Sequence, residues 1–292
     1  MRRLRALEHL QSVTLVTPVG EPSSSWRQWA TAALDLLFPP LCPICHCRLG
    51  EGRRDPLCGS CWERLPRLFP PFCVCCGRPF WTFDGRAADA AGPVEGGGSS
   101  DVPPLPGRSD AAGAGLCGAC ARQRPRFSYA RAAALYRDTA REALHALKFG
   151  GKATLARPLG DLLAETGEVV VPRRTVDCLV PVPLHPARQA ERGFNQSSLL
   201  ARRLSRRWGI PVAEGLLRRV RVTRSQTELS AAERAANVRG AFAVRRPSAV
   251  AGLHVLLIDD IFTTGATVSE CCRVLLDAGA RAAGVFTVAR VG

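Results

Sequence analysis

Four Cys-x-x-Cys pairs lie within residues 42–120 of this 292-residue sequence, and their spacing is that of metal ligands. Such a turn presents two thiolates to one ion, and two turns complete a tetrahedral zinc site. Pairing the turns in chain order predicts two structural sites, one of Cys42, Cys45, Cys58 and Cys61 and one of Cys73, Cys76, Cys117 and Cys120. Four thiolates close the coordination shell, so we expect no metal catalysis at either site.

Disulfides, a redox dithiol and competing ligands are the alternatives to this assignment. The basic start of the sequence is not followed by the apolar segment of a signal peptide, so we expect a cytoplasmic protein, in which disulfides are disfavoured. Four pairs are also more than one catalytic dithiol requires. His46 and Cys47 compete for the first site. The second set contains a 40-residue gap and the extra thiol of Cys75, which leaves its geometry open.

A second candidate site follows an apolar stretch near the carboxyl end of the sequence. Residues 253–268 read LHVLLIDDIFTTGATV, which predicts a strand running into Asp259 and Asp260, then a Thr/Gly loop, then a helix that begins near Thr267. Loop N–H groups, hydroxyls and the helix dipole suit a phosphate, and Gly265 permits a positive φ. Two adjacent carboxylates can accept hydrogen bonds from two sugar hydroxyls. The run therefore predicts a ribose-5-phosphate site, with an ordinary helix cap as the alternative.

This run resembles the fingerprint with which type I phosphoribosyltransferases bind phosphoribosyl pyrophosphate (PRPP). From about residue 38 to 290 the chain resembles the ComF family (ComFC type), which is linked to DNA uptake in natural competence. Four further stretches carry that resemblance: LKFGGK with Lys148 and Phe149, VPVPLHPARQAERGFNQ at 180–196, the run from Arg219 through Thr223 to Leu229, and ERAANVRGAF at 233–242. The cysteine pairs ahead of these stretches fit the same family.

The resemblance implies a role for each matching residue, and Mg²⁺ as the cation that accompanies PRPP. It places the 5-phosphate on Thr263, Thr264, Gly265, Ala266 and Thr267. It makes Asp259 and Asp260 the partners of the ribose hydroxyls, and it implies that Arg188 and Arg192 clamp the pyrophosphate. Gln226, Arg234 and Asn237 would belong to a mobile loop that closes over the substrate, with a solvated polar face as the alternative.

Two functions stay open. The first is a competence protein that binds PRPP or a related phosphoribosyl ligand, with single-stranded DNA and DNA-import proteins as partners. The second is an active phosphoribosyltransferase of nucleotide metabolism, in which an acceptor displaces pyrophosphate from C1 of PRPP. The resemblance favours the setting of DNA uptake. A PRPP-responsive regulator is a weaker third interpretation, because no helix-turn-helix pattern is present.

The charge of the chain is compatible with each of these functions. The formal net charge is +15, and residues 188–246 hold 14 basic and 4 acidic residues. A basic block of this kind suits a phosphate-bearing partner, whether a nucleotide or a nucleic acid. Compositional bias is the alternative, because only Lys148 and Lys152 among the 40 basic residues are lysines.

The elements around these residues predict an α/β fold. We expect strands at 130–136, 176–182, 253–258 and 284–289, and helices at 139–149, 155–165, 194–208, 227–238 and 267–278. Alternating strands and helices indicate a parallel sheet flanked by helices, here of the type I phosphoribosyltransferase kind. The predicted domains are a lead with a docking helix at 1–40, a double zinc ribbon at 41–122 and the transferase-like domain at 127–292. Residues 84–115 are predicted to be a disordered insertion in the ribbon.

The sequence pattern excludes a membrane-spanning protein and a P-loop nucleotide-binding protein. No apolar run approaches the roughly 18–20 residues that a membrane span needs. LKFGGK is not a nucleotide-binding P-loop, because Ala146 stands where that motif needs glycine and Ala153 where it needs Ser or Thr. Lys148 is expected to be a surface lysine, with a specific role as the alternative, because it is one of only two lysines in an arginine-rich chain.

Overall fold

The computed structural model describes residues 40–50, 55–80, 115–223 and 230–292. The predicted docking helix at 26–38, residues 84–114 of the predicted insertion and Gln226 lie outside the described residues. Within the described ranges, every helix falls short of the length and apolarity that a membrane crossing requires.

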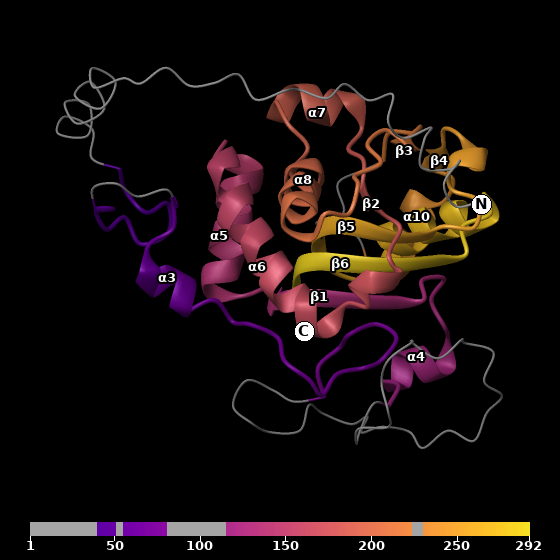
Figure 1. Cartoon of the computed structure of the whole chain (residues 1–292), viewed down its shortest axis with the longest axis horizontal. Helices are drawn as coiled ribbons and strands as arrows, with labels where there is room; N and C mark the ends of the chain where they lie inside the picture. The colour runs from indigo at the N-terminus through magenta and orange to yellow at the C-terminus, as the bar shows by residue number, and fades with distance from the viewer. Residues whose placement is uncertain (1–39, 51–54, 81–114, 224–229) are drawn as a thin grey trace.

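A four-stranded parallel sheet forms the centre of the molecule (Figure 1). Its strands run in the order β1 (Tyr129–Leu135), β6 (Ala282–Arg290), β5 (His254–Phe262) and β2 (Cys178–Pro181), and each neighbouring pair is parallel. All four predicted strands are confirmed. Their carboxyl ends share one edge of the sheet, which is where ligands bind in folds of this kind.

Helices cover both faces of the sheet, as its alternating core residues require. On β5, Leu256 and Ile258 pack with α5 (Asp138–Phe149), α6 (Ala156–Val170) and α8 (Gln196–Trp208). The intervening Val255 and Leu257 belong to the opposite core, with residues of α10 (Ala266–Asp277). α10 also contacts α9 (Ala231–Val238). Because side chains alternate along a strand, a strand buried on both faces is apolar throughout, as the sequence of β5 is up to Ile258.

Four differences from the predicted elements affect the carboxyl edge. β5 continues four residues beyond the predicted end, because Asp259 to Phe262 remain paired with β6. A short helix, α7 (Pro186–Arg192), follows β2, and a small antiparallel hairpin is formed by β3 (Leu217–Arg219) and β4 (Phe242–Val244). α9 begins later than predicted, at a capping box formed by Ser230 and Glu233.

The cysteine-rich segment packs against both faces of the sheet. Its first cluster, beside α3 (Gly59–Glu63), joins the core of α5 and α6, whereas its second, beside α4 (Gly118–Arg122), joins the opposite core. The chain between them runs along the free edge of β1, as Figure 1 shows, and the Leu68 N–H donates to the Ala133 carbonyl at 2.9 Å. The fold is therefore a helix-flanked parallel sheet preceded by a zinc-ribbon-like module.

Candidate functional site

A cleft of about 780 Å³ opens at the carboxyl edge of the sheet. Its walls come from β5, from the loop after β2, and from α5, α7, α8, α9 and α10. Nine of the predicted site residues line it: Arg188, Arg192, Arg234, Asp259, Asp260, Thr263, Gly265, Ala266 and Thr267. Thr264 and Asn237 are not among its lining residues. The structure thus brings together side chains that are up to 79 positions apart in the sequence.

The acidic pair lies inside the paired part of β5, where burial makes a negative charge costly. The Asp260 side chain is only 5% exposed, and its Oδ2 lies 2.9 Å from the ammonium nitrogen of Lys148. The Gln196 amide donates to the same oxygen at 3.0 Å. These contacts offset the cost of burying the carboxylate.

Asp259 has a different environment. Its Oδ1 accepts hydrogen bonds from the Ser197 hydroxyl and from the Asp260 backbone N–H, both at 2.9 Å. Burial, followed by the charge of the neighbouring Asp260, raises the pKa of Asp259 to about 7. The Asp259 carboxyl therefore titrates near neutral pH.

The loop after β5 has the backbone geometry of an anion site. Thr263 and Thr264 are exposed, and Gly265 begins α10 with a φ of 79°. A Cβ at Gly265 would lie 2.6 Å from the Phe262 ring, so both the conformation and the space require glycine. The N-terminal N–H groups of the 12-residue α10 border the cleft.

Basic side chains form another part of the cleft lining. On α7, the Arg192 guanidinium donates to Gln196 Oε1 at 2.8 Å and lies 5.4 Å from the centre of the Phe149 ring. Arg219 and Arg234 each have a buried Nε atom without a hydrogen-bond partner within the described ranges. Burial, followed by the charge of Arg188, lowers the pKa of Arg219. Unsatisfied buried guanidinium donors fit an anionic ligand.

Several residues of the site were not predicted. Lys148 was expected at the surface but lies in the cleft, because its side chain, near the carboxyl end of α5, reaches Asp260 on β5. Arg219, Gln196 and Ser197 contribute contacts that no local pattern indicates. The only sequence signal for Lys148 was its rarity, as one of two lysines in an arginine-rich chain.

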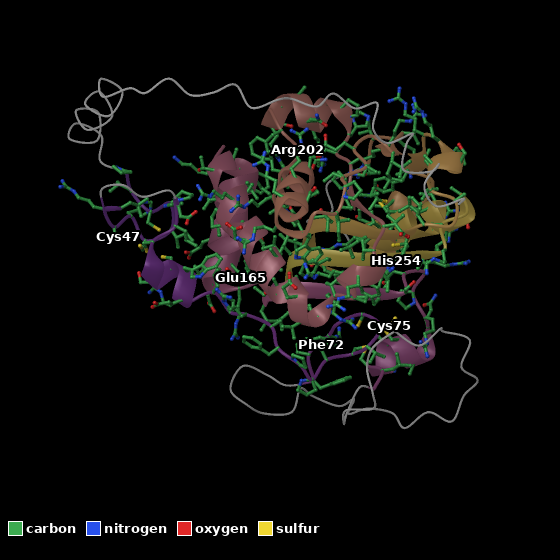
Figure 2. The ribbon with its side chains drawn as sticks, viewed as in Figure 1. Cys47, Phe72, Cys75, Glu165, Arg202 and His254 are labelled. Carbon is green, nitrogen blue, oxygen red and sulfur yellow. The ribbon has the colours of Figure 1, made fainter. Side chains whose placement is uncertain are left out.

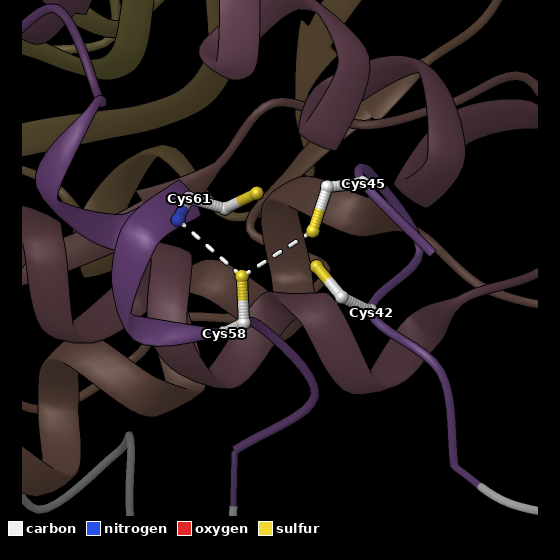
Figure 3. Close-up of side chains that lie close together, drawn as sticks. All are labelled: Cys42, Cys45, Cys58 and Cys61. Carbon is white, nitrogen blue, oxygen red and sulfur yellow. Dashed lines mark hydrogen bonds between the residues drawn. The ribbon is translucent and has the colours of Figure 1, made fainter. Parts of the chain in front are cut away.

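Both cysteine clusters have the geometry of structural zinc sites. In each, the four sulfur atoms lie within 4.8 Å of one another, and Figure 3 shows those of the first cluster converging on one point. Cys45 and Cys58 are 3.5 Å apart and Cys76 and Cys117 3.6 Å apart, far longer than a disulfide bond. These separations approach the edge of about 3.8 Å expected for a tetrahedron with 2.3 Å Zn–S bonds. The 40-residue gap has not prevented the second cluster from assembling.

Two thiols near the clusters are left over. Cys47 accompanies the first cluster and Cys75 the second, on different sides of the molecule in Figure 2. All the described cysteines are free thiols in this structure, so the described pairs are not disulfides.

Two family models match the chain. The model of a double zinc ribbon domain matches residues 33–92, and that of a phosphoribosyl transferase domain matches residues 191–292. The first match ends before Cys117 and Cys120, the pair that completes the second cluster in the structure.

Curated relatives match over most of the chain. The chain is 36% identical to DNA utilization protein YhgH of Salmonella typhi, over 87% of this chain and 99% of that one. It is 31% identical to Competence protein ComFC of Bacillus subtilis, over 81% and 85%. It is also 31% identical to Competence protein F of Haemophilus influenzae, over 60% and 78%.

A solved glutamine PRPP amidotransferase from B. subtilis is 27% identical over 44% of this chain, with a TM-score of 0.31. The chain spans 25% of that enzyme's length.

The two clusters predict a metal content of two zinc ions per chain. Cys58→Ser and Cys120→Ser should each reduce this content to one and lower the melting temperature, because structural zinc contributes folding free energy. Elemental analysis of freshly purified protein checks the content. Cys47→Ser is the matched control and should retain both ions. Wild-type protein without zinc would contradict the assignment.

The raised pKa of Asp259 predicts a pH-dependent effect of Asp259→Asn. The folded state favours the protonated carboxyl, so stability falls as pH rises from about 4 through 7. The neutral amide keeps an acceptor for Ser197 and removes that penalty. We expect the variant to melt roughly 2–6 °C higher than wild type at pH 8 and within about 1 °C of it at pH 4, where wild type carries little of the penalty. Asp55→Asn, at a half-exposed carboxylate, should change neither temperature. An equal difference in melting temperature between variant and wild type at both pH values would contradict the raised pKa of Asp259.

Proposed function

Because this chain belongs to the ComF family of competence proteins, we propose that it acts in DNA uptake and that its cleft binds PRPP, or a closely related phosphoribosyl ligand, together with Mg²⁺. The observation that carries the proposal is the meeting, in one cleft, of a buried carboxylate pair, a glycine-capped helix N-terminus and two arginines whose buried Nε atoms lack a partner among the described residues. A sugar that bears a phosphate at one end and a pyrophosphate at the other needs all three groups.

The proposed ligand position follows from the cleft walls. The 5-phosphate binds the loop Thr263–Thr267, at the N-terminus of α10. The ribose hydroxyls donate to Asp259 and Asp260, and the pyrophosphate lies toward Arg188 and Arg192 on α7. Arg234, which was predicted in the mobile loop, and Arg219, which had no assigned role, supply further donors.

The carboxylates also suit a divalent cation. Asp259 Oδ2 and Asp260 Oδ1 have no hydrogen-bond partner within the described ranges, and carboxylate oxygens together with phosphate are the ligands that Mg²⁺ prefers. When bound, Mg²⁺ would neutralise charge on the pyrophosphate.

Turnover is a second candidate function, favoured by the pKa of Asp259. A carboxyl group that titrates near pH 7 can take the proton of an acceptor while the acceptor bonds to C1 and the bond from C1 to pyrophosphate breaks. Pyrophosphate release from PRPP, assayed against a panel of nitrogenous acceptors, separates this function from binding alone.

Single-stranded DNA is proposed as a partner outside the cleft, in the cytoplasm. Arg206 and Arg207 on α8, and Arg218 and Arg221 in and beside the β3–β4 hairpin, are exposed. A strand held by these charges would lose affinity steeply as salt rises, and a flat salt response would contradict the proposal. DNA-import proteins are proposed to contact the zinc-ribbon module.

Ligand binding predicts a thermal shift. PRPP with Mg²⁺, at about 100 times its Kd, should raise the melting temperature of wild type by roughly 5–10 °C. Asp260→Asn should abolish the increase, because it weakens both the ribose and the cation contacts. Asp277→Asn, an exposed carboxylate at the far end of α10, serves as the matched control and should shift as wild type does. No shift in wild type would contradict the proposed ligand.

A further inference from the structure

Lys148 forms an ion pair with the acidic pair of the cleft, through Asp260. It is the penultimate residue of α5, its side chain is 20% exposed, and its ammonium nitrogen lies 2.9 Å from Asp260 Oδ2. The Gln196 amide, donating to the same oxygen, is the other partner. Lys148 therefore stands at the carboxylate where the proposed ribose hydroxyl or cation would bind.

Lys148 is connected to Arg192 of α7 through shared neighbours. Gln196 donates to Asp260 and, through its Oε1, accepts from Arg192 at 2.8 Å. Arg192 in turn lies over the ring of Phe149, the residue that follows Lys148. Lys148 and Arg192 are thus held by the protein's own acceptors, and a ligand must compete for them.

The charges that line the cleft imply that the Lys148 ammonium group changes its partner when a phosphoribosyl ligand enters. Its described walls carry five basic side chains (Lys148, Arg188, Arg192, Arg219, Arg234) and three acidic ones (Glu191, Asp259, Asp260). A phosphoribosyl ligand with Mg²⁺ brings a cation and hydroxyl donors to the carboxylates, and several negative charges to the rest of the cleft. Once Asp260 has another partner, the nearest uncompensated negative charge for the ammonium group is the ligand's own.

The residue type suits such a change. An arginine would form a planar, two-bond pair with the carboxylate, whereas a lysine presents a point charge on a flexible stem and can re-aim its three donors. Arginine supplies 38 of the 40 basic residues of this chain, yet lysine stands at this position.

We propose that Lys148 exchanges partners when ligand binds, leaving Asp260 for the pyrophosphate group of the phosphoribosyl ligand. The inference rests on the proposed function and adds a ligand-binding residue to it. The exchange predicts effects of opposite sign for a cation and for an anion when the lysine is removed.

Titration calorimetry of Lys148→Ala tests the exchange. Mg²⁺ alone should bind the variant at least 3-fold more tightly than wild type, because the competing ammonium group is gone. PRPP with Mg²⁺, and inorganic pyrophosphate with Mg²⁺, should each bind at least 10-fold more weakly. Lys152→Ala is the matched control: it removes the only other lysine, which is exposed and outside the cleft lining, and should stay within 2-fold of wild type.

The other outcomes contradict either the exchange of partners or the proposed function. Tighter Mg²⁺ binding with unchanged PRPP binding would show that Lys148 only neutralises Asp260, and unchanged affinity for both would show no role in the cleft. Either result overturns the exchange while the proposed function stands. Failure of wild type itself to bind PRPP would overturn the proposed function.

A second measurement needs no variant at Lys148. Reductive ¹³C-methylation keeps the charge of both lysines and yields two lysine signals in the NMR spectrum, which Lys152→Arg assigns. PRPP with Mg²⁺ should move the Lys148 signal and leave the Lys152 signal in place. A stationary Lys148 signal with bound ligand would overturn the exchange.

Discussion

The burial of two adjacent carboxylates in a central strand is the constraint on which the site depends. Asp259 and Asp260 lie on β5, which is paired with β6 and β2 and covered by helices. Charge in such a position is tolerated only where other elements supply donors. Lys148 comes from α5, and Gln196 and Ser197 come from α8. Side chains from both helices therefore reach the carboxyl end of β5, and both helices contribute residues to the lining of the cleft.

The zinc-ribbon-like module is joined to the same edge of the sheet. Arg290, at the end of β6, donates to the carbonyl of Cys76 at 2.5 Å, and its guanidinium lies 5.2 Å from the centre of the Phe262 ring. Phe262 in turn fills the space in which a side chain at Gly265 would stand. The second cysteine cluster is thus connected through two side chains to the loop proposed to hold the 5-phosphate. The module supports the transferase-like domain in addition to ordering its own segment.

Local patterns predicted the features that depend on local chemistry. Cysteine spacing identified both metal-ligand sets, and the alternation of apolar strands with helical stretches identified the parallel sheet. The run from Leu253 to Val268 identified the acidic pair and the glycine-capped loop. Apart from the pairing across the 40-residue gap of the second cysteine set, each of these patterns consists of neighbours in sequence.

The remaining features depend on packing between distant segments. Lys148 and Asp260 are 112 positions apart, so no local pattern indicates their ion pair. The polar pair also suggested that the strand ends at Ile258, whereas the ladder with β6 continues to Phe262. Spacing alone left the second cluster open, because a 40-residue gap fixes neither end. The three-residue strands β3 and β4 are too short for a period to be recognised.

A crystal structure of the protein grown with PRPP and Mg²⁺ tests the central claim most directly. The account predicts the 5-phosphate on the loop Thr263–Thr267, the ribose hydroxyls on Asp259 and Asp260, and the Lys148 ammonium group displaced toward the pyrophosphate. Ligand density outside this cleft, or an empty cleft at saturating PRPP, would contradict it.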